Sequence, residues 1–418
     1  MRTPALLLAC FILAQADKQV MGLLAIDVQQ SFGLTNTQLG FLQGGAFAIA
    51  FAIGGLPISR LIDSGNRVKL AAACVALWSV ATILCGFAGS FAALLLFRAA
   101  TAVAEAGLPP AAFSIFSQQR DPRRVARLTG IFMLAPFVGT GLMFLLGGNL
   151  LEIARSGVVD FVSAAEPWRV VFFAVGVPGL ILAPLLAMFG REPPRTPPPS
   201  NQTTMPDYKS IFRFIFREQP FLRNYYFALT AFYAATASLL AWYPASLVKT
   251  LGMTTGSAGA HAGATYLVGG IAGALAGTAY FSSHRALSPA LMARAFVVLA
   301  ALLGPVVIAL PLMRDLAPSL ALYGLFAFFS SAVLALMPVP VQLTLEDRAR
   351  ARGTAILSLL MSACAGTAGP LFVGVFMDTT GEPLSVALLW TMIISSLASV
   401  WFFARAARST APKFSSTI

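Results

Sequence analysis

The chain has 418 residues, of which 58% are hydrophobic and only 11% are charged, and its mean hydropathy is +0.80. A soluble domain has about 25% charged residues, so this chain carries too few charges to cover the surfaces of soluble domains of its length. The net charge of +12 does not indicate a nucleic-acid-binding protein, because the basic residues form short clusters between apolar runs. The four cysteines lie inside such runs without the spacing of metal ligands. Composition therefore predicts an integral membrane protein.

Twelve apolar runs are each long enough for a helix to cross a bilayer, which takes about 20 residues. Runs of this length favour helices and not a closed barrel, so the sequence predicts an all-α membrane protein. In chain order the runs are Pro4–Asp27, Gln38–Ile58, Val68–Phe87, Phe91–Phe116, Leu128–Leu151, Val170–Phe189, Asn224–Leu247, Ala258–Phe281, Ala295–Leu312, Leu316–Val341, Gly353–Met377 and Leu384–Ala404.

The distribution of basic residues predicts the orientation of these helices. Of the 28 Lys and Arg residues, Lys18 and Arg98 fall inside spans, and nearly all the others occupy the two ends and every second loop. The alternate loops hold only four, namely Arg155, Arg169, Lys249 and Arg314. Since cytoplasmic loops are enriched in Lys and Arg, we expect both termini in the cytoplasm. The start of the chain also resembles a cleavable signal peptide, but cleavage would leave eleven spans and invert this charge pattern, so we expect an uncleaved first helix.

Composition also divides the chain into two halves. A Pro-rich stretch follows Arg191 and is succeeded by a basic amphipathic segment, Tyr208 to Arg223, which is expected to lie along the cytoplasmic leaflet. We predict a six-helix bundle over 1–190, a cytoplasmic linker over 191–223, a second bundle over 224–405 and a cytoplasmic tail over 406–418. The two halves look related, because similar residues open the fifth and eleventh spans, and parallel repeats are typical of two-bundle transporters.

Few ionisable side chains lie inside the spans, and each costs about 2.5–3.5 kcal/mol there, so a function or a partner is expected. Arg98 and Glu105 are seven residues apart on one face of the fourth span, too far for one direct bridge. Asp17 lies at a similar depth in the first span. We therefore predict that Asp17, Arg98 and Glu105 cluster around a central cavity and bind and release a proton. The alternative is a static salt bridge that only holds helices together.

No enzyme or nucleotide-binding motif is present in the sequence, and the chain has only two histidines. We expect neither catalysis nor a cofactor or metal ion, and an ATP-driven pump on this chain is excluded by the missing phosphate-binding loop.

Two motifs resemble those of the major facilitator superfamily. The run from Ser59 to Arg67 is similar to the family's loop 2–3 motif, G-x-L-x-D-R-x-G-R-R, although serines and an asparagine replace some of its residues. The spacing of Arg98, Glu105 and Ala106 resembles the family's span 4 pattern. The resemblance implies two six-helix bundles, gating roles for Asp63, Arg67 and Arg352, and function as a monomer.

Further segments resemble the spinster-like branch of this superfamily. Trp168-Arg169 with the following Gly-Val-Pro-Gly-Leu looks like its span 6, and Asp17-Lys18 stands where the branch has Asp-Arg. The resemblance implies proton-linked movement of lysophospholipids or sphingoid lipids, with Asp17, Arg98 and Glu105 as the proton site.

The leading hypothesis is thus a proton-coupled secondary transporter of the cell membrane (the inner membrane in a bacterium) for a lysolipid or another amphiphile. An organic-anion or drug transporter and a non-transporting receptor or scaffold remain as alternatives. The expected partners are the proton, the solute and membrane lipid, without nucleic acid. The residues suggested to contact the solute are polar or amphipathic groups within spans, namely Gln43, Tyr233, Trp242, Tyr266 and Gln342.

Overall fold

The computed structural model describes residues 2–119, 121–156, 166–194, 208–282, 288–345 and 347–409, and for a few of these, Asp63 included, only the backbone. Within these ranges the chain forms helices and no strand. The predicted tail lies mostly outside them, as does the Pro-rich stretch from residue 195 to 207. Twelve helical segments are long and apolar enough to cross a membrane, which confirms the predicted all-α fold.

The first six spans are formed by α1 (Arg2–Leu23), α3–η1–α4 (Asn36–Gly40, Phe41–Gly45, Ala46–Ser64), α5 (Arg67–Gly86), α6–α7 (Phe91–Glu105, Leu108–Phe116), α8–α9 (Pro122–Phe132, Ala135–Arg155) and α11 (Pro167–Phe189). The last six are α13 (Pro220–Leu251), α14 (Thr255–Ser282), α15–η3 (Pro289–Ala309, Leu310–Leu312), α16–α17 (Leu316–Leu336, Val339–Thr344), α18–η4–α19 (Asp347–Leu359, Leu360–Ala365, Gly366–Thr380) and α20 (Leu384–Arg408). Among the described residues, two short helical segments lie outside the spans, α2 (Ala25–Phe32) and α12–η2 (Tyr208–Arg213, Phe214–Glu218).

Helix starts and breaks follow from local sequence. Asn66, Ser90 and Ser288 cap α5, α6 and α15 by accepting a hydrogen bond from a backbone N–H of the first turn. The fourth span breaks after Glu105, just before a Pro-Pro pair at the start of α7. The second and eleventh spans instead contain the π-helical turns η1 and η4, which are frequent at functional positions.

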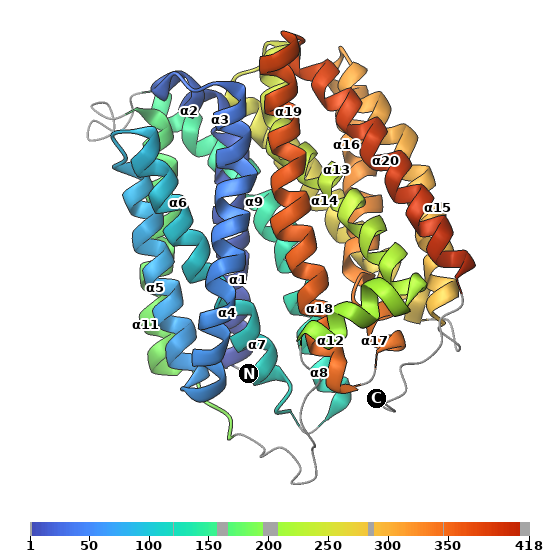
Figure 1. Cartoon of the computed structure of the whole chain (residues 1–418). Coiled ribbons are helices and arrows are strands. Elements are labelled where there is room, and N and C mark those ends of the chain that lie inside the picture. Colours follow the sequence, from blue (N-terminus) through green and yellow to red (C-terminus); the bar gives the residue numbers. More distant parts are fainter. Residues whose placement is uncertain are drawn as a thin grey trace.

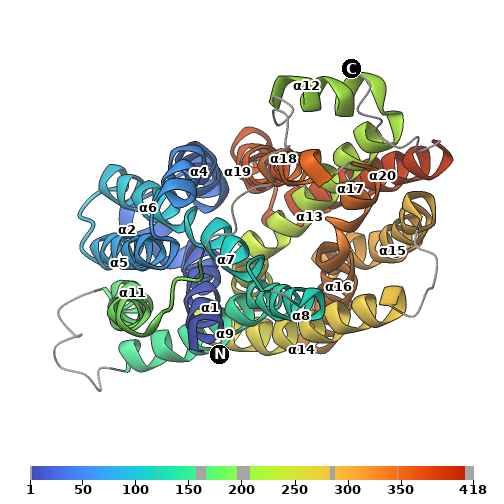
Figure 2. The ribbon, with the colours of Figure 1, turned by 90° about the horizontal axis from the view of Figure 1, so that it is seen from below.

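The two groups of six helices stand side by side, with the first six on the blue-to-green side of Figure 1 and the last six on the yellow-to-red side. They meet where α9 packs on α14 and where α19 packs on α3 and η1. Seen from the end where α1 begins, α4 of the first group lies beside α19 of the second (Figure 2). We refer to this end as the α1-start end and to the other as the far end.

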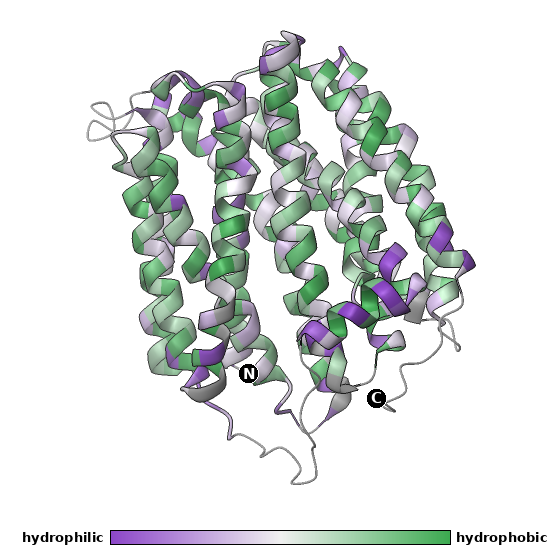
Figure 3. Ribbon diagram, viewed as in Figure 1, coloured by the Kyte–Doolittle hydropathy of each residue, from purple (hydrophilic) through white to green (hydrophobic). Residues whose placement is uncertain are grey.

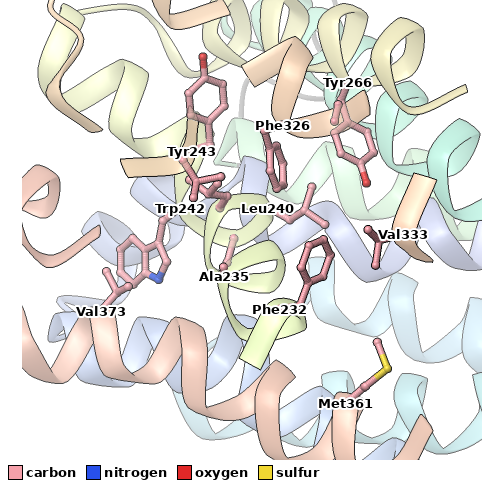
Figure 4. Packing of buried hydrophobic residues seen from close by; sticks show 14 of the residues in the cluster. Phe232, Ala235, Leu240, Trp242, Tyr243, Tyr266, Phe326, Val333, Met361 and Val373 are labelled. Carbon is pink, nitrogen blue, oxygen red and sulfur yellow. The ribbon is translucent and has the colours of Figure 1, made fainter. Parts of the chain in front are cut away.

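Hydropathy varies along the helices as expected for a membrane protein. Hydrophobic residues dominate the middle of the spans, whereas hydrophilic residues gather at the ends and on α12 (Figure 3). Between the helices of the last six spans, aromatic and aliphatic side chains such as Phe232, Trp242, Tyr243 and Phe326 pack closely together (Figure 4). A separate cluster surrounds the buried Trp78 in the first six spans.

Candidate functional site

The predicted mid-membrane charges come from two helices of the first half, α1 and α6. Asp17 on α1 pairs with Arg98 on α6, with 2.7 Å between Oδ1 and Nη1, and each side chain is only 1% exposed. The other carboxylate oxygen of Asp17 accepts a hydrogen bond from the hydroxyl of Thr82 on α5. Both oxygens of Asp17 therefore have donors from neighbouring helices, which is the arrangement that a buried carboxylate requires.

Glu105 is buried beside this ion pair at the last residue of α6. It is 5% exposed, and its Oε1 has no hydrogen-bond partner among the described residues. Asp17, Arg98 and Lys18 all lie within electrostatic range of its carboxyl group. The structure thus brings Asp17, Arg98 and Glu105 together, while the role of the cluster in proton transfer stays a prediction.

Two cations of the site lie near one aromatic ring of the second span. The guanidinium carbon of Arg98 lies 5.1 Å from the ring centroid of Phe47, and Nζ of Lys18 lies 5.8 Å from it. Lys18 also donates a long hydrogen bond of 3.5 Å to the hydroxyl of Tyr233 on α13. Lys18 therefore reaches from the first half to the second, and its ammonium group forms no ion pair among the described residues.

The residues suggested for solute contact fall into different environments. The amide of Gln43 in η1 is buried, and neither its nitrogen nor its oxygen has a hydrogen-bond partner among the described residues. Trp242 donates to the carbonyl of Pro370 at 3.1 Å, and Tyr266 packs against Tyr323 and Phe326. Gln342 on α17 is exposed. Of this set, Tyr233 contacts the charged cluster, through its hydrogen bond with Lys18.

The residues suggested for gating lie near the α1-start end. Arg67 is 1% exposed and joins three segments of the first half: it pairs with Glu192 at 2.6 Å, donates to the carbonyl of Pro193 at 2.6 Å and to that of Ser114 at 3.1 Å. The guanidinium carbon of Arg352 on α18 lies 4.9 Å from the ring centroid of Tyr208 on α12. The side chain of Asp63 lies outside the described part of the structure.

Sequence reasoning missed a contact between the halves at the far end. The carboxylate of Asp378, near the end of α19, accepts hydrogen bonds from the backbone N–H groups of Asn36 at 3.2 Å and Thr37 at 2.7 Å. It also accepts from the Asn36 side-chain amide at 2.8 Å. Arg155, at the end of α9, pairs with Asp27 and donates to Thr255 of α14 at 3.4 Å. These contacts join the halves where α19 packs on α3 and where α9 packs on α14, and no motif in the sequence predicts them.

Thr82 and Phe47 were missed as well. Thr82 is a polar residue in an apolar span and could have been singled out, but its partner on another helix is a long-range contact that the sequence does not reveal. Phe47 is one of 33 phenylalanines and carries no distinguishing signal.

Comparison with known proteins agrees with the fold. A sequence profile of the Major Facilitator Superfamily matches residues 6–368. An MFS-type efflux pump of Mycolicibacterium smegmatis is 26% identical over 92% of this chain and 86% of its own length. A hexuronate transporter of Bacillus subtilis is 25% identical over 92% of this chain and 90% of its own length.

Among solved structures, the chain is similar to a bacterial homologue of the human lysosomal transporter Spinster in an inward-facing, unoccupied conformation. The TM-score is 0.76 at 25% identity, over 97% of this chain and 95% of that one. The expected resemblance to spinster-like transporters is thereby confirmed. Since a superfamily profile matches most of a chain with twelve membrane-spanning helices, the protein belongs to the major facilitator superfamily and is a multi-pass membrane transporter and not an enzyme.

Proposed function

We propose that the protein is a proton-coupled secondary transporter that works by alternating access and moves a lysophospholipid or a related anionic amphiphile. The observation that carries this proposal is the buried Asp17–Arg98 ion pair with Glu105 beside it. A buried ion pair is a poor source of stability, because desolvation offsets most of its attraction. Its position between helices of a transporter favours a functional role.

The charges of the cluster suggest how proton and solute are coupled. With Asp17 and Glu105 ionised, their two negative charges balance the two positive charges of Arg98 and Lys18. A proton on Glu105, whose Oε1 has no hydrogen-bond partner among the described residues, leaves one uncompensated positive charge near Lys18. An anionic head group restores neutrality, so proton binding and solute binding favour each other.

The likeness to a Spinster homologue supports a lysolipid as the solute. In this proposal the head group binds near Lys18 and Tyr233, and the buried amide of Gln43 offers a donor and an acceptor that lack protein partners. Trp242 and Tyr266 would contribute apolar surface, and Gln342 a contact nearer the α1-start end. Asp63, Arg67 and Arg352 are proposed to control the opening at that end.

An organic-anion transporter is the second candidate. The ammonium group of Lys18 suits a carboxylate as well as a phosphate, and the similarity to a hexuronate transporter covers most of both chains. Under either proposal the protein acts as a monomer in the cell membrane, with the α1-start end in the cytoplasm.

Both candidates are tested in proteoliposomes with an imposed pH gradient, using lysophosphatidylglycerol and a hexuronate as solutes. The proposal expects gradient-driven flux of the lysophospholipid and its loss in Glu105→Gln, which keeps the size of the side chain but cannot ionise. Gradient-driven flux of the hexuronate without flux of the lysophospholipid would favour the organic-anion transporter instead.

Lysophospholipid flux that is equally fast in Glu105→Gln would refute the coupling role of this residue. The matched control is Glu382→Gln, an exposed acid at the far end, which is expected to leave the flux unchanged.

A further inference from the structure

The segment α12–η2 is docked on the second half of the protein by one of its faces. Ile211 and Ile215 lie four residues apart and are 1% and 0% exposed. Through this face α12 packs against α18 and η2 against α13. The segment is therefore a fixed part of the α1-start end of the second half.

The opposite face of the segment carries a basic stripe, which we define as Lys209, Arg213 and Arg217. These residues recur at every fourth position, all three are exposed, and none forms an ion pair among the described residues. Residues four apart lie on the same side of a helix, so the three charges point to one partner surface. That partner must be anionic.

An aromatic row continues from this segment across α13 to α20. The ring centroids of Phe212 and Phe216 lie 4.4 Å apart, those of Phe216 and Phe227 lie 5.7 Å apart, and those of Phe227 and Phe402 lie 5.4 Å apart. Trp401 extends the row at 4.6 Å and lies under the guanidinium group of Arg405.

The row is open to its surroundings, because Phe212 and Trp401 are each 51% exposed and Phe227 is 39% exposed. Exposed aromatic rings beside basic residues at the end of a membrane helix are typical of the level at which lipid head groups meet acyl chains.

We propose that the basic stripe and the aromatic row together bind an anionic phospholipid, with its phosphate on Lys209, Arg213 and Arg217 and its acyl chains along the rings. A lipid fits better than an acidic protein segment, because the charges lie next to an apolar row that continues down membrane-spanning helices. Three basic residues near an anionic surface are worth roughly a hundredfold in affinity. This site is separate from the solute site and does not rest on the proposed solute.

The bound lipid is also connected, through α12, to α18 of the eleventh span. Arg352 of α18 stacks on the ring of Tyr208, the first residue of α12. The π-helical turn η4 separates α18 from α19, so α18 can shift against the rest of its span. A lipid that holds α12 in place therefore also holds α18, and solute flux becomes dependent on anionic lipid.

Binding is tested on the purified full-length chain by native mass spectrometry with phosphatidylglycerol and with phosphatidylcholine. The wild-type chain is expected to retain phosphatidylglycerol preferentially, and the triple variant Lys209→Gln, Arg213→Gln, Arg217→Gln to lose about tenfold or more of this preference. The charge-matched control Lys69→Gln, Arg124→Gln, Arg127→Gln removes three exposed basic residues from the first half and is expected to keep it.

Equal preference in the wild-type chain and the stripe variant would overturn the proposal, and so would an equal loss in the control. Hydrogen exchange of residues 208–218 shows whether the stripe variant keeps α12 folded. If the stripe variant unfolds α12, the single variants Phe212→Ser and Trp401→Ser are tested instead, because they leave the charges in place. Unchanged phosphatidylglycerol binding in both would overturn the proposal.

The link to α18 is tested by solute flux in vesicles with and without phosphatidylglycerol. Tyr208→Leu removes the ring and is expected to bind the lipid with wild-type preference while its flux no longer responds to lipid composition. Tyr208→Phe keeps the ring and is expected to behave like the wild-type chain. Wild-type flux that is the same in both vesicle types would overturn the link.

Discussion

The carboxylate of Asp17 accepts hydrogen bonds from donors on two other helices, so the loss of either donor leaves one of its oxygens without a partner. Arg98 supplies the opposite charge and Thr82 a hydroxyl group. Removing one partner of a buried ion pair typically costs about 3–5 kcal/mol, since the other charge stays buried without compensation. A change at Thr82 is milder, because it leaves the ion pair in place.

We expect Thr82→Val to lower the free energy of unfolding by about 1.5–3 kcal/mol, the usual value of a hydrogen bond to a charged group. Thermal unfolding in detergent measures the effect. The control is Thr101→Val, since the buried hydroxyl of Thr101 donates at 2.9 Å to the carbonyl of Phe97 in its own helix, and a loss below about 1 kcal/mol is expected there. Equal losses in the two variants would show that the hydrogen bond from Thr82 to Asp17 stabilises the protein no more than a hydrogen bond within one helix.

At this scale the sequence identified the ionisable members of the site because charge is rare in the spans and therefore conspicuous. It also predicted that Arg98 needs a partner from another helix, and the structure places Asp17 there. Thr82 and Phe47 could not be foreseen in their roles, because polarity or aromaticity alone does not reveal which helix face meets which neighbour.

The two halves meet through pairs of helices that approach closely at glycines. A Cβ atom added at Gly148 of α9 would lie 2.5 Å from the carbonyl oxygen of Gly256 of α14. One added at Gly44 of η1 would lie 2.2 Å from the carbonyl oxygen of Gly366 of α19. Small residues of this kind let membrane helices pack backbone against backbone.

Gly148→Ala is expected to destabilise the protein, although alanine favours a helix over glycine by about 1 kcal/mol. The added methyl group meets backbone atoms of α14, which cannot move aside without separating the two spans. The melting temperature in detergent measures this. Gly130→Ala in α8 of the same span is the control, since nothing lies within 4 Å of its Cβ position, and its stability is expected to stay equal or to rise. Matching melting temperatures for the two variants would argue against close packing of α9 on α14.

The number and type of the membrane-spanning elements followed from hydropathy. A run of about 20 apolar residues crosses a bilayer as an α-helix, because the helix satisfies all its backbone hydrogen bonds internally. The first predicted run, Pro4–Asp27, proved to contain a break, since α1 ends at Leu23 and α2 begins at Ala25. The π-helical turns and the pairing of α3 with α19 were not predicted, because both arise from contacts between segments far apart in sequence.

At the scale of the whole molecule, α1 begins and α20 ends at the same side of the bundle (Figure 1). That side also carries α12 and the charged helix α18. From the positive-inside rule we expect this side to face the cytoplasm.

The orientation is tested with reporter fusions that are active on one side of the membrane only. A phosphatase fused after Leu251 in the loop between the seventh and eighth spans is expected to be active in the bacterial periplasm, and one fused after Ser282 to be inactive. The reverse pattern would place the α1-start end outside the cytoplasm.

We have proposed that solute flux and proton flux are coupled through Asp17, Arg98 and Glu105. The most direct measurement records luminal pH with a trapped dye in proteoliposomes without an imposed gradient, after lysophospholipid is added outside. We expect a change of luminal pH in proportion to solute uptake by the wild-type chain, and no such change in Asp17→Asn, which keeps the shape of the side chain. Solute uptake by the wild-type chain at constant luminal pH, or an unaltered proton flux in Asp17→Asn, would contradict it.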